Sequence, residues 1–199
     1  DWEGAMAAGK KAHEVDPKAY REPTYDQKLA VLNGAVFATG KAPAMRARAD
    51  YFLARGVTPA DYAAALAGYD DIIQRHLEAT DDFAMRAWLR IRVAQSLGYS
   101  LTMAERKLID ADLAEALRRD ARCGRALYVR GRLQLLENED PETWSGKAKE
   151  DDTDDEGVIG LASDVVKRAH GAVADLQAAA EALPKVGAVH FWAARAERA

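Results

Sequence analysis

The sequence predicts an all-α fold of about nine helices, packed in chain order as antiparallel hairpins. Three observations predict it. Alanine, the best helix former, accounts for 42 of the 199 residues. The six prolines lie at breaks between apolar stretches of helical period. Runs of alternating β-branched residues, which would indicate strands, do not occur, so a sheet is not expected.

The stretch from 109 to 136 shows the repeating unit most clearly, as two helices separated by a short break. The apolar residues recur at helical spacing, with Ile109, Leu113 and Ala116 in the first helix and Leu127, Gly131 and Leu135 in the second. Glycine inside a helix costs about 1 kcal/mol relative to alanine. We therefore expect a neighbouring helix to approach the backbone closely at Gly131; the alternative is a mildly destabilising accident.

Nine helices are expected, with glycine, proline or polar residues between them. They cover residues 2–15, 25–39, 44–55, 59–77, 83–97, 103–119, 122–137, 161–183 and 187–199. Two start signals are clear, because Thr58 precedes a proline and Thr102 has Glu105 three residues on, as in a capping box. Phe37 is expected on the buried side of the second helix and Leu77 on that of the fourth.

A small residue, a large residue, an alanine and a proline recur at successive spacings of four, three and five. The three sets are Ala5, Gly9, Ala12 and Pro17; Ala47, Tyr51, Ala54 and Pro59; and Ala172, Leu176, Ala179 and Pro184. Two further sets keep the spacing without the proline: Ile109, Leu113, Ala116 and Ala121; and Ala65, Tyr69, Ile72 and Leu77. This pattern resembles the second-helix signature of the tetratricopeptide repeat family, and Gly34, Phe37, Trp88 and Gly131 match slots of its first helix.

The resemblance covers most of the chain and implies a right-handed superhelical stack of helix hairpins, a tetratricopeptide-like α-solenoid. It implies that the first helix of each hairpin lines a concave groove and that the protein binds a protein or peptide there. The family period is about 34 residues, whereas the matching prolines Pro17 and Pro59 lie 42 residues apart. The number of repeats therefore stays open, between three and five.

Positive charge is concentrated in the middle of the chain, although the net charge is only −4. Residues 86–136 contain eleven Lys and Arg against five Asp and Glu. By the resemblance, Arg86, Arg90, Arg125 and Arg132 face the groove. Arginine forks there would hold the carboxylates of an acidic peptide or protein partner. The alternative is a solvated charged face.

An acidic loop is expected as an insertion over residues 138–160. Residues 137–156 carry ten Asp and Glu against two lysines, too much charge for the segment to pack alone. Trp144 is its apolar exception and is a candidate anchor for a partner; the alternative is a mobile insertion. Asp152, Asp154, Glu156 and Gly157 resemble the start of a calcium loop, but Ser163 stands where the closing acid belongs.

Catalytic and metal-binding patterns are not found in the sequence. His13, His76, His170 and His190 are scattered one to a helix, and Cys123, the only cysteine, excludes an internal disulfide. No apolar run approaches the length of a membrane span. We therefore expect no enzyme activity, cofactor, metal, nucleic-acid partner or membrane insertion.

The function predicted is a protein–protein interaction scaffold or adaptor, acting as one single-domain piece, residues 1–199, of a longer protein. The alanine and arginine content is typical of a bacterial protein, and the single thiol suits the cytoplasm. The first alternative is a sensory or regulatory domain of a larger signalling or transcription protein. The second is a helical enzyme. Neither the oligomeric state nor the partner's identity follows from the sequence.

Overall fold

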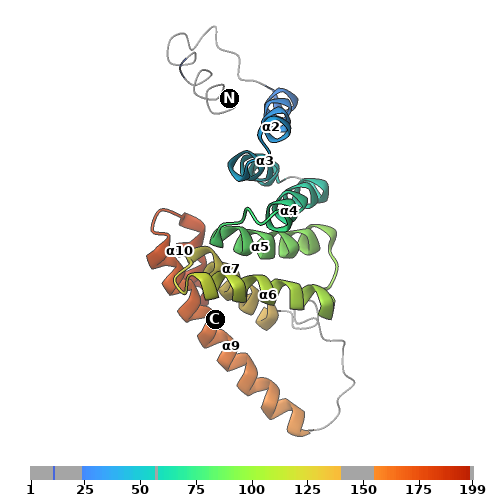
Figure 1. Cartoon of the computed structure of the whole chain (residues 1–199). Helices are drawn as coiled ribbons and strands as arrows, with labels where there is room; N and C mark the ends of the chain where they lie inside the picture. The colour runs from blue at the N-terminus through green and yellow to red at the C-terminus, as the bar shows by residue number, and fades with distance from the viewer. Residues whose placement is uncertain (1–10, 12–23, 57, 140–154, 198–199) are drawn as a thin grey trace. The chain divides into compact units, whose positions relative to one another are not determined.

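The computed structural model describes residues 11, 24–56, 58–139 and 155–197, and their regular secondary structure is entirely helical (Figure 1). No strand occurs in these residues, so the all-α prediction is confirmed. Their helices are α2 (Tyr25–Thr39), α3 (Ala42–Arg55), α4 (Pro59–Gln74), α5 (Thr80–Leu97), α6 (Met103–Arg119), α7 (Gly124–Glu139), α9 (Asp155–Ala182) and α10 (Gly187–Ala196). Of the helix expected over 2–15, only residue 11 lies in the described part of the chain, and it is helical.

The expected and observed helix bounds differ at several places, among them the start of α5, which lies at Thr80 and not at residue 83. Helix α4 ends at Gln74, three residues early, and His76 has a φ of 56°, the left-handed conformation that stops a helix. Leu77 then follows outside the helix and is 37% exposed, so its predicted inward position is wrong. The segment expected as a loop over 138–160 is helical at both ends, because α7 runs to Glu139 and α9 begins at Asp155.

Threonine caps begin three of the helices. Thr24, Thr58 and Thr102 each accept a hydrogen bond from the backbone N–H three residues on, and the side chain at that position bonds back to the threonine N–H. These reciprocal bonds form capping boxes, which satisfy two of the free donors at each helix start. The caps predicted at Thr58 and Thr102 are therefore confirmed.

The first compact unit of the chain covers Asp1–Glu78. Within it, α3 packs against both α2 and α4. Its core contains Met45 and Ala49 of α3 and Ala65, Tyr69 and Ile72 of α4, all at most 1% exposed. The Tyr69 hydroxyl donates a hydrogen bond to the Asp50 carboxylate at 2.6 Å, which satisfies the polar end of this buried ring.

Phe37 was expected in this core, and that prediction is wrong. Its side chain is 95% exposed, whereas Leu32 is the buried residue of α2. Five residues along a helix correspond to a rotation of about 140°. The two side chains therefore cannot share a face, and the face of Leu32 is the one that meets the unit.

The second compact unit covers Ala79–Ala199. In it α5 packs against α6, α7 against α9, and α10 against α9, each pair being consecutive among the described helices (Figure 1). Helix α7 also contacts α5, α6 and α10. The helices α5, α7 and α10 are therefore neighbours in series, and α7 is the centre of the unit.

Ion pairs join successive helices of this unit. Arg106 of α6 pairs with Glu137 of α7, and Arg130 of α7 donates two hydrogen bonds to Asp175 of α9 at 2.6 and 2.7 Å. Both carboxylates are more than nine-tenths buried. Burial raises the pKa of Glu137, and the charge of Arg106 opposes that rise. Each pair therefore fixes one helix against the next while holding a charge inside the protein.

Gly131 is a point of close helix contact, as predicted. A Cβ added there would lie 2.8 Å from Leu176 Cγ and 3.1 Å from the Ala172 carbonyl oxygen, both on α9. These distances are shorter than ordinary van der Waals contact. The absence of a side chain therefore lets α7 and α9 approach each other.

Gly131→Ala is expected to lower the free energy of unfolding by about 1–3 kcal/mol, because overpacking at Leu176 exceeds the helix-propensity gain of alanine. Urea unfolding followed by circular dichroism measures it. Gly34→Ala in α2 is the matched control, since a Cβ there meets nothing within 4 Å. That control should raise stability, by up to about 1 kcal/mol. An equal gain from both substitutions would contradict the close contact.

Candidate functional site

Two of the predicted groove arginines meet at a buried carboxylate of α6. Arg86 donates from Nε to Asp112 Oδ2 at 3.0 Å and from Nη2 to Asp112 Oδ1 at 2.5 Å, a two-pronged contact. Arg90, one turn further along α5, pairs with the same carboxylate. Asp112 is only 3% exposed. These contacts place Arg86 and Arg90 against α6 and give them a role in joining two helices.

Arg125 lies near the start of α7 and belongs to a different set of contacts. Its Nε is 3.4 Å from Asp81 Oδ2, and both side chains are about half exposed. The Cys123 thiol donates to the other Asp81 oxygen at 3.3 Å, and burial raises the pKa of that thiol. Arg125 is thus the most solvent-accessible of the four arginines that the sequence singled out.

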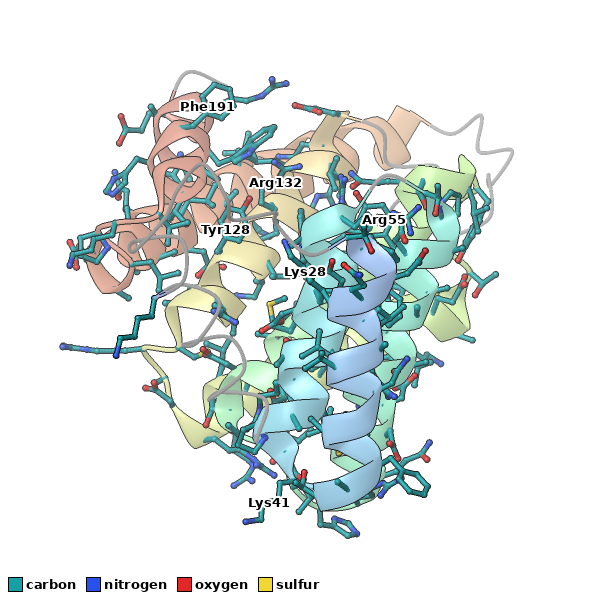
Figure 2. The ribbon with its side chains drawn as sticks, turned by 90° about the horizontal axis from the view of Figure 1, so that it is seen from above. Lys28, Lys41, Arg55, Tyr128, Arg132 and Phe191 are labelled. Carbon is teal, nitrogen blue, oxygen red and sulfur yellow. The ribbon has the colours of Figure 1, made fainter. Side chains whose placement is uncertain are left out.

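Arg132, labelled in Figure 2, lies against aromatic rings from two other helices. Its guanidinium carbon is 3.3 Å from the centroid of the Trp192 ring of α10 and 5.8 Å from that of Trp88 of α5. Arg92 also lies over the Trp88 ring, at 5.7 Å, and Arg195 over the Trp192 ring, at 5.0 Å. We call this set the Arg132 cluster: Trp88 and Arg92 of α5, Tyr128 and Arg132 of α7, and Trp192 and Arg195 of α10.

The charge of Arg132 is buried without an ion pair among the described residues. The side chain is 7% exposed, and its Nε has no hydrogen-bond partner. Burial lowers the pKa of Arg132; the nearby charges of Arg92 and Arg195 add to that, while Tyr128 and Glu139 oppose it. A guanidinium stays protonated even so. The cluster therefore contains a permanent cation held by ring faces, in a place crowded with like charge.

The outer part of the cluster is open to solvent. Arg195 donates to Glu139 Oε1 at 2.6 Å, and both side chains are about half exposed. Phe191, 60% exposed, meets the Trp192 ring edge to face with centroids 5.2 Å apart. Figure 2 shows Phe191 on α10 and Arg132 on α7, with Tyr128 one turn before Arg132. The cluster thus leads from exposed aromatic and arginine side chains to a buried cation.

Most of this cluster was missed in the sequence, although a local signal was present. An aromatic residue is followed one helical turn later by arginine in Trp88 and Arg92, in Tyr128 and Arg132, and in Trp192 and Arg195. Residues three or four apart share a helix face. The pairs occur on the three helices that are neighbours in series, α5, α7 and α10. A search for repeated aromatic–arginine pairs would have found the site.

The other predicted features concern the acidic loop, metal binding and membrane insertion. Trp144 and most of the calcium-like segment lie outside the described residues. Within the described ranges, no three His, Cys, Asp or Glu side chains are placed to hold a metal ion. None of the helices in that part of the chain is both long and apolar enough to cross a bilayer.

Comparison with known proteins does not place the chain in a family. No protein-family model matches the sequence. A search of curated proteins likewise finds no match.

Proposed function

We propose that this chain is a protein–protein interaction module that binds an acidic peptide or protein segment across α5, α7 and α10. The single observation that carries the proposal is the Arg132 cluster, in which tryptophan, tyrosine and arginine from these three helices lie together. Trp, Tyr and Arg are the residues that most often dominate binding energy at protein interfaces. The charge of Arg132, which has no ion pair among the described residues, favours a partner that carries negative charge.

The order of helix contacts supports a tetratricopeptide-like α-solenoid as the architecture. Helices α5 and α6 form one pair, α7 and α9 the next, and α10 follows. In a stack of hairpins the first helices of successive pairs lie beside one another on the concave side. In this arrangement α5, α7 and α10 are those first helices, so the Arg132 cluster would lie on the concave face.

We propose the bacterial cytoplasm as the location of this protein. The single thiol, Cys123, suits such a reducing compartment.

The test is binding of a fluorescein-labelled pool of dodecapeptides rich in Asp and Glu, measured by fluorescence polarisation. The native chain should bind this pool and leave a matched Lys-rich pool unbound. Arg132→Met should weaken binding about 30-fold or more, the size of an interface hot spot of about 2 kcal/mol.

The matched control is Arg118→Met in α6. The Arg118 side chain is 70% exposed and pairs with Glu115 on its own helix, so binding should stay within about twofold of the native chain. Circular dichroism melts of both variants establish that they fold. Equal weakening by the two substitutions would show only general charge attraction and would overturn the proposal.

A further inference from the structure

Three arginines converge on two indole rings in the Arg132 cluster, and the carboxylate of Glu139 pairs with the outermost of them, Arg195. Arg132 lies between Trp88 and Trp192, with Arg92 and Arg195 stacked on the same rings. Glu139 pairs with Arg195 at 2.6 Å and attracts Arg132 through space without an ion pair to it. The strongest anionic contact of the site is therefore made to its most exposed arginine.

The arginines of this site, among them Arg132 with an Nε that has no hydrogen-bond partner among the described residues, suit an oxyanion with several oxygens. Arginine forks bind carboxylate and phosphate by parallel N–H···O bonds. A carboxylate brings one negative charge and two oxygens, and the side chain of Glu139 is already such a carboxylate. A phosphate monoester brings about −1.5 to −2 charges and three acceptor oxygens, so it can bond two guanidinium groups at once. The second arginine available beside Arg195 is Arg132, which no carboxylate of the described residues pairs with.

We propose that the Arg132 cluster binds the phosphoryl group of a phosphorylated residue in the peptide partner, and that Glu139 competes with this group for Arg195. The inference rests on the proposed function and names the partner's chemistry. The phosphoryl oxygens accept from Arg195 and from the outward edge of Arg132. Phe191 and Trp192 contact the peptide beside it. Glu139 is the internal carboxylate that the ligand displaces.

If Glu139 competes with the phosphoryl group for Arg195, substitutions of Arg132 and of Glu139 should change phosphopeptide affinity in opposite directions. Arg132→Met removes the inner cation and should weaken binding of a phosphopeptide about 30-fold or more. Glu139→Gln removes the competing carboxylate while keeping the side-chain shape, and should tighten binding about threefold or more. A residue that only supported the fold would give no gain when replaced. Arg132→Lys keeps the charge without the fork and should still lose about tenfold, which covers the case in which Arg132→Met does not fold.

The experiment uses fluorescence polarisation with three labelled dodecapeptide pools that share randomised flanks. Their central residue is phosphoserine, serine or glutamate, and inorganic phosphate is the competitor. The phosphoserine pool should bind at least about tenfold more tightly than the glutamate pool. Phosphate alone should compete only at millimolar concentration, since it lacks the peptide contacts.

Each other outcome overturns the proposal in a distinguishable way. Equal binding of the phosphoserine and glutamate pools would remove the phosphoryl preference and leave the acidic-peptide function standing. Phosphate competing as well as the peptide would show an anion site with no peptide recognition. Weaker binding by Glu139→Gln would rule out competition. Binding of none of the acidic pools would remove the proposed function together with this inference.

Discussion

Replacing Asp112 with asparagine should lower the free energy of unfolding by about 3–5 kcal/mol, the usual cost of removing one partner from a buried ion pair. Asp112 is 3% exposed and receives Arg86 and Arg90 from α5. Asparagine keeps the shape and one acceptor but removes the charge that balances the two guanidinium groups. Urea unfolding followed by circular dichroism measures the loss.

A triple variant separates the cost of the lost charge from that of altered packing. In the variant that combines Arg86→Met, Arg90→Met and Asp112→Leu, no charge of the set remains in the protein. Replacing all members of a buried ion pair by apolar residues often leaves the free energy of unfolding nearly unchanged. The triple variant should therefore recover most of the stability that Asp112→Asn loses. A loss below about 1 kcal/mol for Asp112→Asn would contradict the buried ion pair.

Leu176→Ala should cost about 2–5 kcal/mol, because it opens a cavity at the contact between α7, α9 and α10. Leu176 is fully buried and packs in one cluster with Leu135 of α7, Ala172 of α9, and Ala193 and Ala196 of α10. Helix α10 has ten residues, and two of its three buried side chains, Ala193 and Ala196, pack in this cluster. Hydrogen exchange should accordingly show the amides of α10 losing protection before those of α6.

Leu108→Ala is the control for this prediction. Leu108 lies on α6 and is 50% exposed, so its removal should change stability by no more than about 0.5 kcal/mol. Since Trp192 and Arg195 are carried by α10, the Leu176→Ala variant should also bind acidic peptides more weakly, whereas Leu108→Ala should bind as the native chain does. Unchanged exchange in α10 would show that its position does not depend on Leu176.

The helices could be predicted from the sequence because their signals are local. Alanine content, threonine caps and glycine stops act within a turn or two of where they occur, and the bounds expected for residues 25–39 agree with α2 at both ends. The close contact at Gly131 could also be predicted. A glycine inside a helix lowers helix stability, and close approach of a neighbouring helix is a reason for its presence. Phe37 could not be placed, because the neighbour that a helix face meets is decided by the rest of the fold.

The candidate site was predictable only in part for the same reason. Arg132, which the sequence singled out, lies in the Arg132 cluster, whereas Arg86 and Arg90, also assigned to the groove, pair with Asp112 of α6. Charge spacing along one helix does not reveal which neighbouring helix offers an acid. Trp88 was matched only to a slot of the family's first helix, and only the contacts between α5, α7 and α10 bring it and Trp192 to the arginines.

The ion pairs between helices also determine which helix surfaces match. Alanine-rich helices present apolar stripes of nearly uniform shape, so sliding one helix by a turn, about 5.4 Å, would keep much of the apolar contact. Such a slide would separate Arg130 from Asp175 and Arg106 from Glu137, leaving charges buried alone. These ion pairs therefore fix the register of each helix against its neighbour. If two copies of the chain exchanged a hairpin, the exchange would be tolerated only if each arginine paired with the equivalent carboxylate of the other copy.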